Sequence, residues 1–88
     1  MVLLGRRSAE EKVATFLLGW CERLSVLKGP SGTVPLPMGR QDIADYLGLT
    51  IETVSRTLTI LENSAAIALP SSRRIVLRNP AALRRLNG

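Results

Sequence analysis

The stretch that decides the fold is RQDIADYLGLTIETVSRTLTILE, residues 40–62. Its apolar residues recur at spacings of three and four, which predicts two amphipathic helices over about residues 40–47 and 50–63. Only Gly48 and Leu49 separate the two predicted helices. Helices joined so closely must meet at a steep angle, so the stretch predicts a helix-turn-helix.

Suitable N-terminal caps precede both helices of this motif. Gly39 comes before the first helix, and the hydroxyl of Thr50 can accept a hydrogen bond at the start of the second. Gly48 is expected to end the first helix, because glycine readily adopts a positive φ. The inward-facing residues predicted for the first helix are Ile43, Ala44 and Leu47.

The second helix of the motif has two distinct faces. When successive residues are placed about 100° apart, Ser55, Arg56 and Thr59 lie within about 60° of Glu52. The apolar side chains fall on the opposite arc, which we expect to face the core; they are Ile51, Val54, Leu58 and Leu61. A helix held by its apolar side can present its polar side to a DNA major groove, which accommodates one helix.

The polar face carries side chains that can read base edges. Arg56 can donate two hydrogen bonds to guanine O6 and N7, and Glu52 can accept one from the N4 amine of cytosine. Ser55 is expected to meet a base or a phosphate. The spacing of Glu52 and Arg56 is equally that of an exposed salt bridge within a helix, which is common and stabilises the helix only weakly.

Several other polar side chains are candidates for phosphate contacts. Thr50 and Thr53 lie at the helix N-terminus, where backbone amides and the helix dipole favour anions, and Thr59 lies on the same face. The basic candidates outside this helix are Arg40, Arg73, Arg74 and Arg78. The arginines after residue 72 are equally compatible with a solvated strand edge whose charges discourage strand pairing.

Upstream of the motif, the sequence predicts one further helix. Residues 1–7 lack periodicity and are expected to be a linker. Ser8 and Glu11 have the spacing of a capping box, so the helix should begin there and end in the loop over residues 28–32. Its predicted core stripe is Val13, Phe16, Leu17, Trp20, Leu24 and Leu27.

Between this helix and the motif, residues 33–38 are expected to be extended and to lie at a sheet edge, because two prolines remove ladder donors. After the motif, alternating apolar residues predict a hairpin with its turn at residues 70–73. The hairpin residues expected to cover the helices are Ile67, Leu69, Ile75 and Leu77.

The chain is expected to finish with a short helix. Asn79 is placed as its N-cap and Pro80 as its first residue, a position that tolerates the missing amide proton. Its inward residues are predicted to be Ala82, Leu83 and Leu86. Together these elements predict a mainly α domain with a small β-hairpin wing, a winged helix-turn-helix, over residues 8–88.

Composition narrows the possible functions. The 88 residues carry 12 Lys and Arg against 7 Asp and Glu, a net charge of +5, which favours an anionic partner such as nucleic acid. No apolar run approaches the roughly 18 residues that span a bilayer, and the N-terminus has no signal-peptide pattern, so a cytoplasmic location is expected. With three aromatic residues in the chain, stacking on single-stranded nucleic acid is not expected.

The sequence predicts neither an enzyme nor a bound metal or cofactor. Histidine is absent, so the commonest general base and zinc ligand are missing. The seven glycines are scattered and match no phosphate-binding loop. The single cysteine, Cys21, is expected to be a small buried hydrophobe; a redox-sensing role would need a lowered pKa that no neighbouring pattern indicates.

With its preceding glycine, the opening stretch resembles the DNA-binding domain of the Crp/Fnr superfamily of bacterial transcription regulators. The segment ETVSR, residues 52–56, resembles the Fnr and FixK branch, in which Glu, Ser and Arg at these positions read a TTGAT half-site. The resemblance assigns base contacts to Glu52, Ser55 and Arg56. It extends upstream through LGRRSAEEKVATFLL and downstream through the wing.

The resemblance also implies how such a domain is used. Family members dimerise on palindromic DNA, and RNA polymerase is a further candidate partner. Their sensory β-barrel and dimerisation helix, which in some members hold an iron-sulfur cluster or a cyclic nucleotide, have no counterpart in this sequence, so none of those sites is assigned here. The domain alone is expected to be monomeric or weakly associating. A winged-helix protein-interaction module is the alternative function.

This sequence departs from the family pattern after the second motif helix. The family usually has glycine there, whereas this chain has Ser64, Ala65 and Ala66. Alanine tolerates a positive φ poorly, so the turn is expected to differ in detail.

Overall fold

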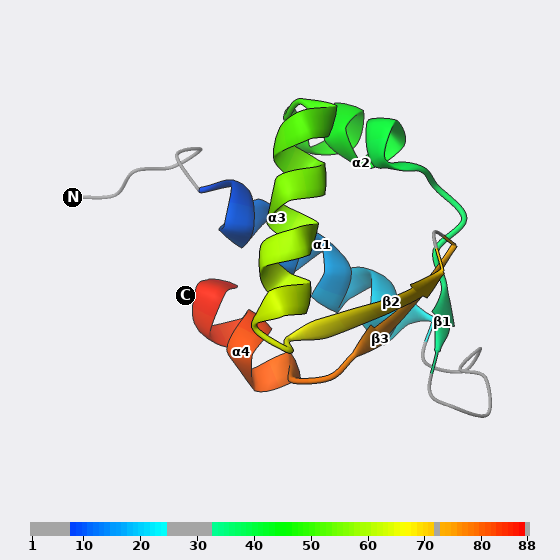
Figure 1. Ribbon diagram of the computed structural model, residues 1–88, viewed down its shortest axis with the longest axis vertical. Helices are drawn as coiled ribbons and strands as arrows, with labels where there is room; N and C mark the ends of the chain where they lie inside the picture. The colour runs from blue at the N-terminus through cyan, green and yellow to red at the C-terminus, as the bar shows by residue number, and fades with distance from the viewer. Residues whose placement is uncertain (1–7, 25–32, 72, 88) are drawn as a thin grey trace.

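A computed structural model describes residues 8–24, 33–71 and 73–87 of the protein. The elements in chain order are α1 (Ala9–Arg23), β1 (Val34–Pro35), α2 (Arg40–Leu47), α3 (Ile51–Asn63), β2 (Ile67–Ser71), β3 (Arg74–Leu77) and α4 (Pro80–Asn87). Figure 1 shows the sheet beside the lower half of α3, with α2 across its top and α1 and α4 behind. The predicted winged helix-turn-helix is confirmed. Within the described ranges, no helix has the length and apolar character needed to cross a membrane.

The first helix begins where the sequence predicts. The Ser8 hydroxyl accepts from the Glu11 amide at 3.1 Å, and the Glu11 carboxylate accepts from the Ser8 amide at 2.9 Å, which completes the capping box. The predicted end of α1 is wrong by about one turn. The helix stops at Arg23, because Leu24 leaves helical geometry and its amide is shared between the carbonyls of Trp20 and Glu22. Leu27 and the loop over residues 28–32 lie outside the described residues, as does the linker at 1–7.

The core is built where α1, α3, α4 and the inner face of the sheet meet. Its fully buried large side chains include Leu17 of α1, Leu58 of α3 and Leu83 of α4. The prediction that Phe16 and Trp20 are core residues is only partly right. Both are half-buried at the edge of the core, and the Trp20 indole N–H donates to the Pro35 carbonyl at 2.9 Å.

The turn between α2 and α3 follows the sequence prediction closely. Gly48 adopts a left-handed conformation, with φ 72° and ψ 33°, and ends α2. The Leu49 amide donates back to the Ala44 carbonyl at 2.8 Å. Thr50 then caps α3, since its hydroxyl accepts from the Thr53 amide at 3.1 Å. Ile43 and Ala44 are buried, as predicted, and Leu47 is partly buried.

The C-terminus of α3 closes in a left-handed turn made by alanine. Ala65 has φ 62°, the one positive φ among the described non-glycine residues. The Ala66 amide donates to the Leu61 carbonyl and the Ala65 amide to the Glu62 carbonyl, each at 3.0 Å. These two bonds form a Schellman motif, which normally has glycine at the left-handed position. The chain therefore reverses from α3 into β2 with a backbone geometry that alanine disfavours.

The wing contains one strand more than the predicted hairpin. The sheet order is β1-β3-β2, with both neighbouring pairs antiparallel. The short β1 lies at an edge, as its prolines predict, and pairs Val34 with Ile75. A register shift between Ala68 and Ser71 bulges β2 where Pro70 cannot donate a ladder bond. Because β2 continues to Ser71, the hairpin turn is shorter than the predicted residues 70–73.

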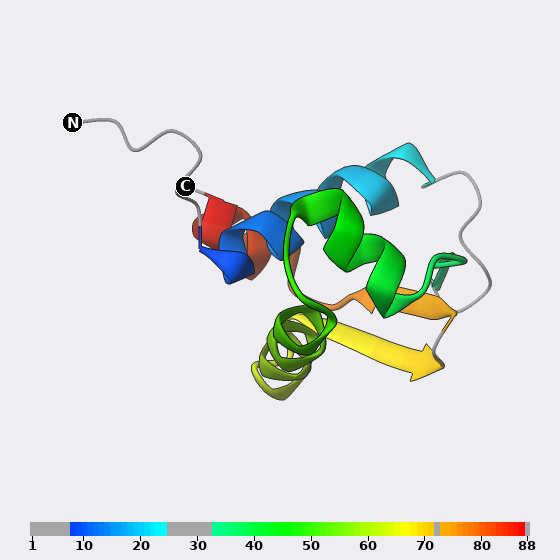
Figure 2. The same ribbon diagram turned by 90° about the horizontal axis from the view of Figure 1, so that it is seen from above.

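The last helix packs on the first. Its N-cap is confirmed, since the Asn79 side-chain oxygen accepts from the Ala82 amide at 3.2 Å. Leu83 is fully buried, and Ala82 and Leu86 are partly buried against the same core. In Figure 2, α4 lies beside the start of α1, while α3 is seen nearly end-on and projects from the other side of the domain. One face of α3 is consequently left open.

Candidate nucleic-acid interface

The second helix of the motif, α3, is held by one arc of its surface. Val54, Leu58 and Leu61 are at most 2% exposed, as the sequence predicts. Thr57 completes this arc and is 3% exposed, with its hydroxyl donating to the Thr53 carbonyl at 2.7 Å. Sequence periodicity did not predict the burial of Thr57, because threonine is a polar residue in the sequence pattern. Its bond to the carbonyl four residues earlier satisfies the group and makes burial possible.

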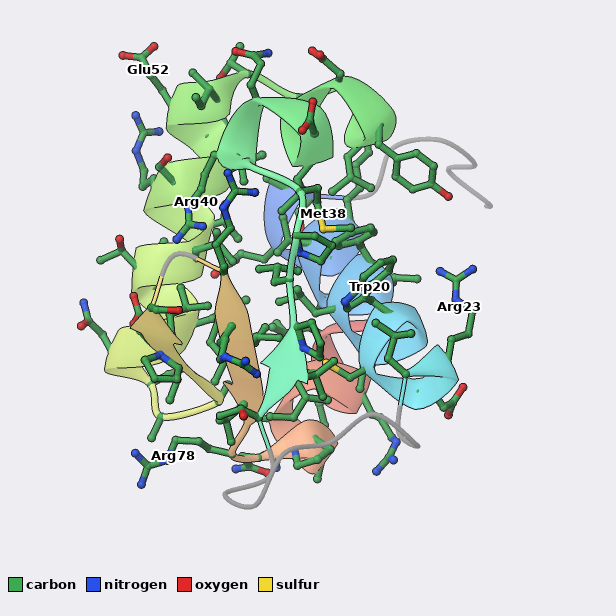
Figure 3. The ribbon with its side chains drawn as sticks, turned by 90° about the vertical axis from the view of Figure 1, so that its right-hand side faces the viewer. Trp20, Arg23, Met38, Arg40, Glu52 and Arg78 are labelled. Carbon is green, nitrogen blue, oxygen red and sulfur yellow. The ribbon has the colours of Figure 1, made fainter. Side chains whose placement is uncertain are left out.

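The three residues predicted to contact bases lie together on the open face. Glu52, Ser55 and Arg56 are all exposed in the first two turns of α3. Figure 3 shows Glu52 at the outer end of the helix, pointing away from the domain. Among the described residues, Glu52 and Arg56 are not joined in an ion pair, so each charge faces solvent. The face can therefore present a donor and an acceptor to an incoming ligand.

Ile51 is a correction to the sequence prediction. Periodicity placed it on the core face, but its side chain is 42% exposed. It is the first residue of α3, at the end of the helix that lies beside α2. An exposed aliphatic group thus lies next to Glu52. The helical angle could not predict this exposure, because the angle gives the direction of a side chain and not what packs against it.

The threonine hydroxyls of α3 are not equally available. Thr50 caps the helix and donates its own proton to the Thr53 hydroxyl at 2.9 Å. Thr53 accepts this bond, so its own proton remains available to donate. The Thr59 hydroxyl donates to the Ser55 carbonyl at 3.0 Å, within the helix. Of the three predicted phosphate-binding threonines, Thr53 is best prepared to donate to an anion.

The predicted basic residues are divided between two places. Arg40 is half-buried at the start of α2, and Arg73 and Arg74 are exposed at the tip of the wing. The Arg73 guanidinium donates to the Pro37 carbonyl, which ties the wing tip to the segment leading into α2. Arg78 follows the far end of β3 and lies at the opposite end of the sheet in Figure 3. The structure therefore groups Arg40, Arg73 and Arg74, and separates Arg78 from them.

Cys21 is 4% exposed in the core, which confirms its assignment as a small buried hydrophobe. In the part of the chain that the structure describes, no group of three or more His, Cys, Asp or Glu side chains could hold a metal ion.

The comparison with known families agrees with this geometry. A family model described as the Crp-like helix-turn-helix domain matches residues 11–86. This chain belongs to that family. It is 80% identical over 69 residues to the nitrogen fixation regulation protein FixK of Bradyrhizobium diazoefficiens, covering 78% of this chain and 29% of that protein. It is 57% identical over 88 residues to FixK of Azorhizobium caulinodans, covering 99% of this chain and 36% of the relative.

Solved structures support the same placement. The structure of FixK2 from Bradyrhizobium japonicum superposes with a TM-score of 0.84 at 49% identity, covering 98% of this chain and 41% of that one. A CooA mutant from Carboxydothermus hydrogenoformans gives a TM-score of 0.81 at 24% identity, covering 97% of this chain and 39% of that one; this likeness concerns the fold alone. The chain thus spans about a third of the length of its FixK relatives.

Proposed function

We propose that this Crp-like domain binds double-stranded DNA sequence-specifically and thereby serves transcription regulation. The observation that carries the proposal is the open face of α3, where Glu52, Ser55 and Arg56 are exposed while the opposite arc is buried. The relatives support it: one is named a transcriptional activatory protein, AadR of Rhodopseudomonas palustris, and is 70% identical over 69 residues.

The proposed target is a TTGAT-like half-site read in the major groove. Arg56 donates two hydrogen bonds to a guanine, and Glu52 accepts from the N4 amine of a cytosine. Ser55 contacts a neighbouring base. Ile51 adds an aliphatic group at the leading end of the helix, which suits the C5 methyl of a thymine. A half-site rich in thymine offers such a methyl on several of its base pairs.

The reading face is the exposed face of α3 that carries Glu52, Ser55 and Arg56. Phosphate contacts are proposed around it. Thr53 donates its free hydroxyl proton to a phosphate near the N-terminus of α3, and Arg40 and Arg74 supply charge from α2 and the wing tip. Arg73 stays in the proposed phosphate set, although its guanidinium also holds the Pro37 carbonyl. Thr50 and Thr59 are secondary members, because their hydroxyl protons are already donated within α3.

In the intact regulator, two copies are proposed to bind the two halves of an inverted repeat. A single domain then binds weakly, because it lacks the effective concentration that a linked partner supplies, a gain of about 10²–10⁴-fold.

The test is fluorescence anisotropy with a TTGAT palindrome and a scrambled duplex across a salt series. We expect tighter binding of the palindrome, and affinity for both duplexes that falls with salt as phosphate counterions are released. Equal affinity for the two duplexes would refute specific reading. Binding that does not respond to salt, or no binding, would refute the DNA interface itself.

Two arginine variants separate reading from phosphate contact. Arg56→Ala is expected to remove the preference, about 1–3 kcal/mol, and to leave the residual binding shared with the scrambled duplex. Arg74→Ala is expected to weaken both duplexes similarly and to lower the slope of log K against log salt by about 1. The reverse pattern would show that the two roles are wrongly assigned.

A further inference from the structure

The aromatic side chains of this protein gather on a surface that DNA reading does not use. The chain has one Phe, one Trp and one Tyr. Phe16 and Trp20 stack with ring centroids 6.3 Å apart, and Phe16 meets Tyr46 at 5.8 Å. Tyr46 is 75% exposed, and Phe16 and Trp20 are only half-buried. Such a cluster leaves considerable apolar area in water, which marks interaction sites on small proteins.

These rings line two adjoining hollows between α1 and α2, of about 320 and 300 Å³. Both hollows are bordered by Phe16, Arg23 and Tyr46, so they lie side by side, and the pair is called here the α1–α2 groove. Its other contributors include Trp20 and Met38. Phe, Trp, Tyr, Met and Arg are the residue types enriched at protein interfaces, and all five occur here.

The groove has the dimensions and periodicity of a helix-binding site. Lys12, Phe16, Gly19 and Arg23 occupy positions i, i+4, i+7 and i+11 of α1, so all four fall on one stripe, each within about 40° of Lys12. Eleven residues of helix span roughly 16 Å, which is about three turns. Gly19 lies between the two ends, and a Cβ there would meet no atom within 4 Å. The surface above Gly19 is therefore open to close approach by another backbone.

The charges of the groove select an acidic occupant. Lys12 lies at one end, where its ammonium also donates to the Leu47 carbonyl at 3.4 Å, and Arg23 lies at the other, where its Nε donates to the Gly19 carbonyl at 3.3 Å. Asp42 is the one acid among the described residues lining the two hollows, and it faces the N-terminus of α2, where its carboxylate accepts from the Gly39 amide at 3.4 Å. A second copy of this domain, docked through the same face, would bring these cations toward their own equivalents.

The groove also lies away from the DNA-reading face. Figure 3 shows Trp20 and Arg23 on the side of the domain opposite α3 and Glu52. An occupant could therefore bind while the reading face is engaged. We propose that the α1–α2 groove docks an amphipathic helix of a partner protein, with apolar side chains along one face and carboxylates at both ends of that face.

The test uses a 15-residue helical peptide, held by a lactam staple, with leucines at i, i+4 and i+7 and glutamates at both ends of that face. Its partner probe has lysines in place of the glutamates. Trp20 is the single tryptophan of the chain, so its emission reports directly on the groove. In the full 88-residue chain we expect saturable binding of the acidic peptide and at least about tenfold weaker binding of the basic one.

Three variants make the test specific. Gly19→Leu fills the open position without a clash at Cβ and favours the helix, so it should fold and lose the acidic peptide by about tenfold or more. Glu22→Leu adds the same side chain at an exposed position beside the stripe and should bind as the wild type does. Lys12→Glu combined with Arg23→Glu should exchange the preference, so that the lysine peptide binds more tightly.

The proposal is overturned if both peptides bind equally, if Trp20 emission does not change, or if Gly19→Leu binds as tightly as Glu22→Leu. It is also overturned if sedimentation shows that the chain self-associates and Gly19→Leu abolishes this, because a second copy would then be the occupant. Gly19→Leu leaves the net charge unchanged and should keep wild-type affinity for the TTGAT palindrome. If the wild type failed to bind DNA, the peptide titration would still test the groove, because it is done without DNA.

Discussion

Replacing Ala65 by glycine is expected to stabilise the domain. Ala65 occupies the left-handed position of the turn after α3, with φ 62°. This region costs an L-residue with a Cβ about 1–2 kcal/mol. Glycine removes the strain, but its greater freedom in the unfolded chain lowers the free energy of unfolding by about 0.4–1 kcal/mol. The net gain should be about 0.5–1 kcal/mol, or about 2–8 °C in melting temperature for a domain of this size.

Gly48 supplies the matched control for this prediction. It has φ 72° and is surrounded by open space, since a Cβ there would meet no atom within 4 Å. Gly48→Ala therefore introduces backbone strain alone and should destabilise the domain by about the amount that Ala65→Gly gains. Ala81, exposed in the ordinary helical backbone of α4, supplies a second control. Ala81→Gly should destabilise by at most about 0.5 kcal/mol, because Ala81 is the second residue of α4 and not in its interior.

Urea unfolding followed by circular dichroism measures these differences as shifts of the midpoint at constant slope. An Ala65→Gly variant that is less stable than the wild type, or unchanged, would refute the strain assigned to the turn. A change in the slope would instead indicate that the unfolded or native state had altered in compactness, and the comparison would then no longer isolate φ.

Variants at three further residues test how α3 is held and what it reads. Leu58 is 2% exposed, so Leu58→Ala should cost about 2–5 kcal/mol in urea unfolding; a smaller loss would show that the arc is poorly packed. Thr50→Ala should cost about 1 kcal/mol by losing the cap, and Thr50→Ser should restore it; equal stability of the two would contradict the capping role. Replacing thymine by deoxyuridine in the half-site should weaken wild-type binding in anisotropy but leave Ile51→Ala unaffected. Equal losses would remove Ile51 from the reading face.

Local sequence patterns predicted most of the helices because each helix carries its own signals. The capping box at Ser8, the left-handed Gly48 and the cap at Thr50 act through neighbours within three or four residues. The buried arc of α3 followed from periodicity for the same reason. The exposure of Glu52 and Arg56 on the opposite side of the helix followed from the same periodicity, and their base contacts stay a prediction.

The features that sequence did not predict depend on distant contacts. Ile51 is 42% exposed at the first position of α3, because the tertiary fold and not a local period decides what packs beside this turn. Trp20 stays at the edge of the core because its indole N–H donates a hydrogen bond to the Pro35 carbonyl, fifteen residues away in the sequence. Arg73 reaches the Pro37 carbonyl across the sheet. Each of these placements needs the tertiary fold, so composition and spacing could name the residue but not its partner.

The structure also bears on why a single domain should bind weakly. At its start, α3 is fixed by the Gly48 turn and the Thr50 cap, and at its end by the two backbone bonds around Ala65. Between them, the buried arc anchors Leu58 and its neighbours in the core. All of these restraints come from within the chain, so the reading face needs no second copy to take its pose. Weak binding by the lone domain should then reflect the missing effective concentration of a linked partner rather than a disordered helix.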